Sequence, residues 1–128
     1  MNIDLKIAKK TVQTEIQALK KLLLSFGRSS SASFSKAVNL LSKMRGKCLV
    51  IGVGKSYIVS LKVSATLSSL GTPSVAFSAN DLQHGGLGAI QKNNDVLLVF
   101  SVSGESSELN SILRYANRHN IPIIGVSC

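Results

Sequence analysis

Two short stretches of the sequence carry side chains that could bind an anion or move a proton. The first is GVGKS, residues 52–56, in which two glycines precede Lys55 and Ser56. The second is SVSGESS, residues 101–107, in which serines surround Gly104 and Glu105. Serine hydroxyls and the N–H groups of a helix N-terminus bind phosphate oxygens, whereas a carboxylate can transfer a proton. The combination predicts acid–base chemistry beside a bound phosphate.

GVGKS matches neither of the two well-known nucleotide-binding loops. A Walker loop needs a glycine at position 49, which is Leu49, and a dinucleotide fingerprint needs one at position 57, which is Tyr57. A strand-to-helix turn remains, where Gly54 lets the backbone approach a ligand closely. A plain turn with no ligand is the alternative interpretation.

The serine-rich stretch also follows an apolar run and opens a helix, so its hydroxyls and N–H groups favour an anion. Glu105 would repel a phosphate, so we interpret it as a proton-transfer group or a partner for sugar hydroxyls. A first-turn carboxylate stabilised by the helix dipole is the alternative. The predicted substrate-binding residues are Gly54, Ser56, Ser101, Val102, Ser103, Gly104 and Ser106.

Both stretches need a scaffold, and the N-terminal third predicts helices. Apolar residues recur at steps of three and four over residues 3–26, from Val12 to Phe26, which is typical of one long helix. Gly27 offers a stop. Residues 28–33 predict a short flexible connection, and residues 34–44 a second helix.

The remainder alternates short apolar runs with helical stretches. The runs at 48–54, 75–77, 96–103 and 121–127 are rich in β-branched residues and predict strands, with helices at 55–70 and 105–118 and a loop before the third strand. This order predicts a parallel α/β sheet covered on both faces, with ligands at the carboxyl ends of the strands. We expect one domain, 1–128, with helices over 1–45 and a βαβ core over 46–128.

Charge and cysteine content narrow the function classes. The net charge is +9, and residues 1–47 hold ten Lys/Arg against two Asp/Glu. We interpret this as a solvated or subunit-facing helix surface, with nucleic-acid binding as the weaker alternative because no known DNA-binding motif appears. Cys48 and Cys128 lack metal-site spacing and predict free thiols. No apolar run predicts a membrane span or secretion signal, so we expect a cytoplasmic protein.

The motifs GVGKS, LSSLGTPSVAF, LQHGGLG, VFSVSGESSEL and IPIIGVS resemble, in order and spacing, the SIS domain, the phosphosugar-binding fold of sugar isomerases. Within that family the chain is similar to bacterial D-arabinose 5-phosphate isomerases of the KpsF/GutQ type. The resemblance implies a flavodoxin-like parallel sheet and a homo-oligomer, often a tetramer. It also implies interconversion of D-arabinose 5-phosphate and D-ribulose 5-phosphate, for the lipopolysaccharide sugar Kdo, without a metal or organic cofactor.

Residue by residue, the resemblance makes Lys55, His84 and Glu105 the catalytic candidates. In this interpretation Glu105 is the base or acid, Lys55 stabilises the enediolate, and His84 helps ring opening or orients a hydroxyl. Two departures from the family pattern stand out. The family loop usually reads HGDLG, whereas this sequence has Gly86 in place of the aspartate. In addition, the sequence stops at Cys128, before the further strands and active-site residues of the family pattern.

We therefore expect a truncated SIS domain in which one sheet face lacks a covering helix. Ile121, Ile123, Ile124 and Val126 would then need a partner surface, which predicts weak stability or self-association. A non-catalytic phosphosugar-binding module or an inactive fragment is the alternative function, because a sensor needs the serines but not the catalytic trio.

Overall fold

The structure is a computed structural model that describes residues 2–27 and 30–127. The chain forms two compact units, one up to Val38 and one from Asn39 onward. No helix in the described part of the chain is long and apolar enough to cross a membrane.

The first unit contains the long helix α1 (Ile3–Ser25), which confirms the helix expected over residues 3–26. The side chain of Asn2 caps it by accepting a hydrogen bond from the N–H of Asp4 at 3.1 Å. No described residue of α1 is buried. Leu19 and Leu23 are 65% and 71% exposed, so this part of the apolar stripe has no partner within the described chain, whereas Phe26 at its end meets the Phe34 ring edge-on, with centroids 5.2 Å apart.

Helix α2 (Ser30–Lys43) begins earlier than the sequence indicated. The expected flexible connection over 28–33 is wrong for residues 30–33, which are helical, whereas Arg28 and Ser29 lie outside the described residues. The serine run lacks glycine and proline, and serine is tolerated in a first helical turn. The helix ends at Lys43, one residue before the predicted end.

Four parallel strands form the sheet of the second unit. They are β1 (Cys48–Gly52), β2 (Ser74–Ser78), β3 (Val96–Phe100) and β4 (Ile123–Val126). Their spatial order is β2-β1-β3-β4, with Leu49 beside Leu97 and Leu97 beside Ile123. The arrangement confirms the predicted parallel α/β sheet. Its strand order, β2-β1-β3-β4, is the order in which a flavodoxin-like sheet begins.

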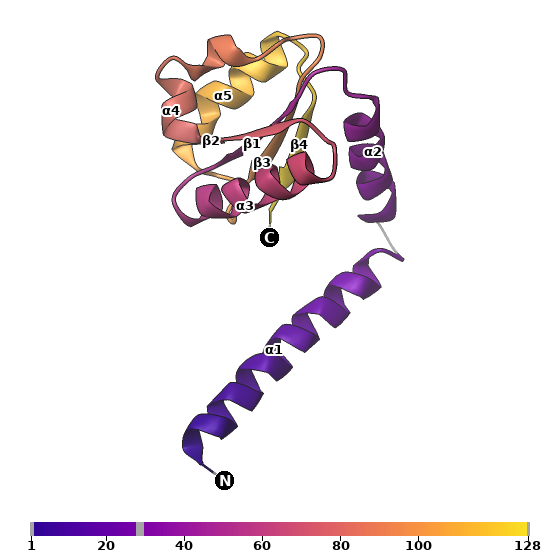
Figure 1. Cartoon of the computed structure of the whole chain (residues 1–128), viewed down its shortest axis with the longest axis vertical. Coiled ribbons are helices and arrows are strands. Elements are labelled where there is room, and N and C mark those ends of the chain that lie inside the picture. The colour runs from indigo at the N-terminus through magenta and orange to yellow at the C-terminus, as the bar shows by residue number, and fades with distance from the viewer. Residues whose placement is uncertain (1, 28–29, 128) are drawn as a thin grey trace. The chain divides into compact units, whose positions relative to one another are not determined.

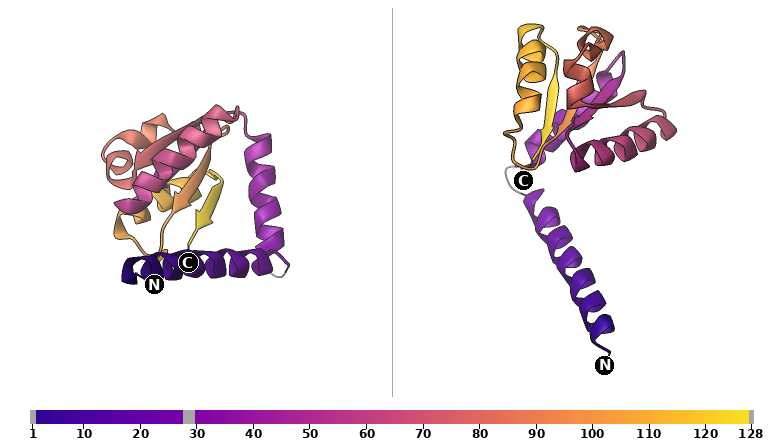
Figure 2. Two further views of the ribbon diagram at one scale, coloured as in Figure 1. Left: turned by 60° about the horizontal axis from the view of Figure 1, so that its bottom comes forward. Right: turned by 90° about the vertical axis from the view of Figure 1, so that its left-hand side faces the viewer.

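Helices cover both faces of the sheet, as Figures 1 and 2 show. Helix α3 (Lys55–Ser69) lies on one face, and α4 (Ala79–Gln83) packs against α5 (Ser107–Arg118) on the other. A short 3-10 helix, η1 (Gly86–Ala89), follows α4. The sequence predicted only a loop between β2 and β3, so α4 and η1 were missed.

Alternating side chains of the strands divide the core into two clusters. Leu49 and Ile51 point to the α4/α5 face, where Leu97, Val99, Leu82 and Ile112 join them. Cys48, Val50 and Leu98 point to the other face, with Val63 and Leu67 of α3 against them. This period-two burial is what a strand covered on both faces requires.

The edge strand β4 is better covered than the sequence suggested. Ile121 is only 4% exposed, so the expectation that it needs a partner surface is wrong. Ile123 and Ile124 are half-buried against the two clusters, because α5 and the end of α2 reach this side of the sheet. Val126 is 44% exposed, so of the four residues expected to need a partner surface it is the one that remains largely uncovered.

A buried ion pair fixes the start of β3. The Asp95 side chain is fully buried, and its oxygens accept hydrogen bonds from Lys47 N and Nζ, each at 2.8 Å, and from Gln91 N at 2.7 Å. Burial alone would raise the pKa of the Asp95 carboxyl, but the Lys47 ammonium and the two backbone N–H groups lower that pKa below its usual value. The carboxylate therefore stays charged inside the fold.

Candidate functional site

The two motifs lie where the strand order of the sheet reverses. From β1 the chain moves outward to β2 and then returns to place β3 on the other side of β1. GVGKS follows β1, and the serine-rich stretch follows β3, so both occupy the carboxyl ends of neighbouring parallel strands. Ligands bind at this switch point in open α/β sheets. The topology thus brings together the two stretches that the sequence singled out.

The turn after β1 depends on two glycines. Gly54 caps α3 with φ 57° and ψ −122°, a conformation that side-chain-bearing residues rarely adopt. A Cβ on Gly52 would lie 2.6 Å from the backbone nitrogen of Tyr57, so only glycine lets the first turn of α3 pack onto the strand end. As a result Ser56 sits half-buried beside the strand, with Lys55 exposed before it.

The serine-rich loop folds on its own hydroxyl groups. The Oγ of Ser101 accepts a hydrogen bond from the N–H of Gly104 at 3.0 Å, and the Oγ of Ser103 accepts one from the N–H of Glu105 at 3.2 Å. Two of the N–H groups that the sequence offered to an anion are therefore already paired within the loop. The hydroxyl protons of both serines remain able to donate.

A cavity of about 180 Å³ joins the two stretches. Ser56 and Ser101 both line it, together with Val102. Val59, Phe100 and Val126, none of which was predicted as a site residue from the sequence, form its apolar wall. Their alternation within a helix and two strands is the pattern of core residues, so the available signal pointed to packing and not to a site.

The predicted catalytic side chains do not line this cavity. Lys55 and Glu105 are exposed at the start of α3 and before α5, on either side of the switch point. His84 is exposed too and follows β2 by the length of α4, as the C-cap of that helix. The described part of the chain brings Ser56 and Ser101 together but gives none of the trio a side-chain hydrogen bond or ion pair.

The loop after His84 is fitted to glycine. Gly85 has φ 120°, and a Cβ on Gly86 would lie 2.9 Å from Cδ1 of Leu82, which is fully buried. The end of the flexible Leu82 side chain would therefore have to shift to admit a larger residue at position 86, where the family resemblance led us to expect aspartate.

The described residues contain no metal-ligand cluster, and their free cysteine is buried. No group of three His, Cys, Asp or Glu residues among residues 2–27 and 30–127 is placed to hold a metal ion. Cys48 is a buried free thiol, as expected, and Cys128 lies outside the described residues. Burial and the nearby Asp95 charge raise the pKa of Cys48 to about 11, which makes it a poor nucleophile at neutral pH.

Comparison with known proteins gives the family. Residues 40–128 match the family model of the SIS domain, so the chain belongs to the SIS domain family. The match covers the whole sheet, both motifs and the His84 loop. It confirms the fold class that the sequence analysis inferred from these motifs.

Among individual proteins, two bacterial relatives are similar in sequence to most of this chain. The arabinose 5-phosphate isomerase KdsD of Pseudomonas aeruginosa is 37% identical over 120 residues, which are 94% of this chain and 35% of that protein. The KdsD of Francisella tularensis is 34% identical over 123 residues, with 94% and 36% covered. The chain thus spans about a third of the length of the curated relatives it matches.

The fold of one solved structure is also similar to the fold of this chain. An Escherichia coli CFT073 protein, solved in complex with arabinose 5-phosphate, superposes with a TM-score of 0.86 at 29% sequence identity. The superposition covers 99% of this chain and 66% of that one. The chain therefore has the fold of this structure as well as the sequence pattern of the SIS domain family.

Proposed function

We propose that this chain carries the phosphosugar site of an aldose–ketose isomerase that interconverts D-arabinose 5-phosphate and D-ribulose 5-phosphate. The observation that carries the proposal is the convergence of Ser56 and Ser101 on one cavity at the switch point. The isomerase relatives support the choice of pentose, as does the neighbour solved with arabinose 5-phosphate. A role in supplying Kdo for lipopolysaccharide rests on the family resemblance alone.

In the proposed reaction, Glu105 takes the proton from C2 of the open-chain aldose. The electron pair of that C–H bond forms the C1=C2 double bond, and the C1 carbonyl oxygen takes a proton to give an enediol. The C2 hydroxyl then loses its proton as C1 gains one, which yields the ketose. Lys55, at the start of α3, supplies positive charge for the enediolate oxygen.

The phosphate has its own group of ligands in this proposal. The hydroxyls of Ser56, Ser101, Ser103 and Ser106 donate to its oxygens, and the first turns of α3 and α5 add the positive ends of their dipoles. His84 contributes to ring opening or hydroxyl orientation. Because His84 is exposed and outside the cavity lining, this role requires the His84 loop to move or another copy of the chain to supply it.

The test is proton NMR of D-arabinose 5-phosphate with the purified chain in D₂O. We expect ribulose 5-phosphate to appear, with deuterium at C2 of the recovered aldose and at C1 of the ketose, because the enediol exchanges its proton with solvent. A folded sample that neither turns over nor broadens the sugar signals would refute the proposal.

A non-catalytic phosphosugar-binding module is the second candidate. The observation that favours it is the split between the serines, two of which line the cavity, and the exposed trio, which does not. Line broadening of the sugar without turnover, in the same NMR experiment, would select this function.

We also propose that the chain forms a homo-oligomer through the apolar stripe of α1. Replacing both Leu19 and Leu23 by glutamate is expected to dissociate it to a 13.6 kDa monomer, because charges would enter the buried interface. Sedimentation velocity over a range of concentrations measures this. The control, with Gln13 and Gln17 replaced by glutamate on a different side of α1, should stay assembled. A wild-type chain that is monomeric throughout would contradict the proposal.

A further inference from the structure

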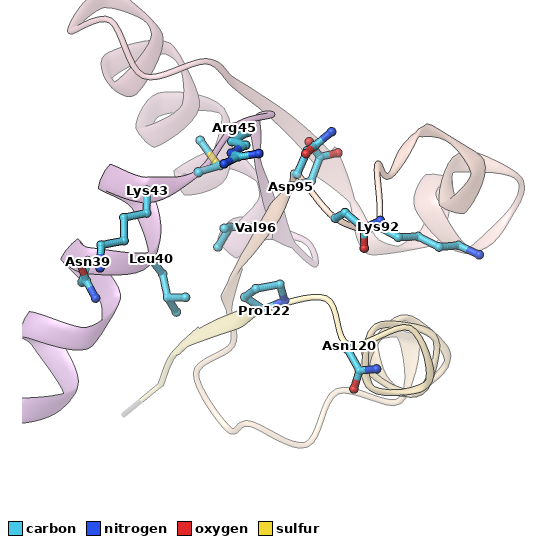
Figure 3. Close-up of a pocket in the computed structure, with 12 residues that line it drawn as sticks. Asn39, Leu40, Lys43, Arg45, Lys92, Asp95, Val96, Asn120 and Pro122 are labelled. Atoms are coloured by element: carbon cyan, nitrogen blue, oxygen red, sulfur yellow. The ribbon is translucent and has the colours of Figure 1, made fainter.

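A second pocket lies at the other end of the sheet, where β3 and β4 begin (Figure 3). It encloses about 400 Å³, within the range of small-molecule sites. Val96 opens β3 on one side, and Pro122 precedes β4. The five residues of β3 separate this pocket from the Ser101 loop by roughly 15 Å. The two sites are therefore distinct.

The walls of this pocket are fixed by the fold. Leu41 and Met44 pack against the core cluster on the α3 side, which anchors the last turn of α2 that carries Asn39 and Lys43. On the facing side, the N–H of Gly46 donates to the carbonyl of Asn94 at 2.8 Å. Contacts within the fold therefore hold the pocket on two sides.

The charge balance of the lining is positive. Lys43 and Arg45 are exposed at its rim and form no ion pair within the described chain, and in Figure 3 the Lys43 side chain extends toward Asn39 while Arg45 lies on the Asp95 side. Asp95, the one carboxylate among the described lining residues, is buried and already compensated by Lys47. Lys92 extends away from the pocket in Figure 3 and lies 5.9 Å from the centre of the Tyr115 ring. Lys43 and Arg45 therefore remain available to an anion.

Neutral donors also line the pocket. The lining includes the carboxamides of Asn39, Asn93, Asn94 and Asn120, each of which can donate and accept. Leu40, Val96 and Pro122 provide an apolar floor. Among the described residues, the lining has no aromatic ring on which a nucleobase could stack, which argues against single-stranded nucleic acid.

We propose that this pocket is a second binding site, separate from the phosphosugar site, for a small organic phosphate with hydroxyl groups. Arg45 and Lys43 bind the phosphate oxygens through charge-assisted hydrogen bonds, and the asparagines bind the hydroxyls. β3 starts at this pocket and ends at the serine loop, so an occupant here contacts the same strand that positions Ser101.

The experiment is a titration of the isotope-labelled full chain with glycerol 3-phosphate, followed by amide NMR. We expect saturable shifts of the Asn94 and Asn120 amides, and none with neutral glycerol at the same concentrations. Replacing both Lys43 and Arg45 by glutamine should weaken this binding by about tenfold or more, because two charged donors are lost. The control, with Lys20 and Lys21 of α1 replaced by glutamine, changes the net charge equally and should leave the affinity unchanged.

Three results would overturn the proposal. The Asn94 and Asn120 amides could fail to shift or to saturate. The two double variants could weaken binding equally, which would show general electrostatic attraction. Shifts confined to Gly104 and Glu105 would show that the phosphate binds only at the phosphosugar site. Both replaced residues are exposed, so the variant is expected to fold.

Discussion

Glu105→Gln is expected to lower the turnover of D-arabinose 5-phosphate by roughly a thousandfold, which is typical for the loss of a general base. Glutamine has nearly the same shape but cannot take the C2 proton. The Ser103 hydroxyl accepts from the backbone N–H of residue 105, a contact that the substitution leaves in place. The loop should therefore keep its conformation, and the affinity for the sugar should change by less than about twofold.

The measurement pairs turnover, by NMR, with affinity, by calorimetry, for Glu105→Gln and for Glu108→Gln. Glu108 is an exposed carboxylate in the first turn of α5, so its variant makes the same chemical change a few residues away. We expect Glu108→Gln to keep full activity. If Glu105→Gln turns over the sugar at the wild-type rate, another residue is the base. If both variants lose activity, the loss comes from the changed local charge and not from a missing base. A wild-type chain that binds without turnover would select the binding module instead.

The sheet could be predicted from the sequence because its strands are short and apolar, and because the two central strands, β1 and β3, are buried on both faces. Cys48–Gly52 is buried along its whole length, and such a run between helical stretches favours a parallel strand. The parallel topology then places the two motif stretches at one edge without any knowledge of contacts. Hence the switch-point location of Ser56 and Ser101 followed from local patterns.

Local patterns failed where tertiary contacts decide the structure. Helix α4 has only five residues, too few for a periodic signal, and it exists because Ala79 and Leu82 pack into the core beside α5. The start of α2 at Ser30 is also invisible to composition, since a serine-rich segment is equally typical of a loop.

The site shows the same limit at the level of single atoms. The sequence showed that the loop after β3 contains serines. It did not show that the Ser101 and Ser103 hydroxyls accept backbone hydrogen bonds within that loop. Nor could it place His84, whose position depends on the length and packing of α4. The roles of Lys55, His84 and Glu105 stay predictions for mutagenesis.

Asp95→Asn is expected to lower the free energy of unfolding by about 2–3 kcal/mol at pH 7. The Asp95 carboxylate accepts three hydrogen bonds, from Lys47 N, Lys47 Nζ and Gln91 N, whereas an asparagine offers one oxygen and turns an N–H₂ group toward the other donors. The cost stays below that of a fully buried broken pair, because the Lys47 side chain is 29% exposed and also donates to the Ala89 carbonyl. Denaturant unfolding at fixed protein concentration measures the change, and exposed Asp81→Asn, as the control, should lose less than about 1 kcal/mol.

The pH dependence separates this electrostatic effect from a simple packing defect. The folded-state pKa of Asp95 is lowered, so its contribution is fully present above the unfolded pKa of about 4 and is lost as the pH falls through the folded value. The stability difference between wild type and Asp95→Asn should therefore be constant from pH 7 to about pH 5 and shrink below about pH 4. A difference that persists unchanged into strong acid would mean that the asparagine disturbs packing, and that the Lys47–Asp95 charge pair is not what holds the start of β3.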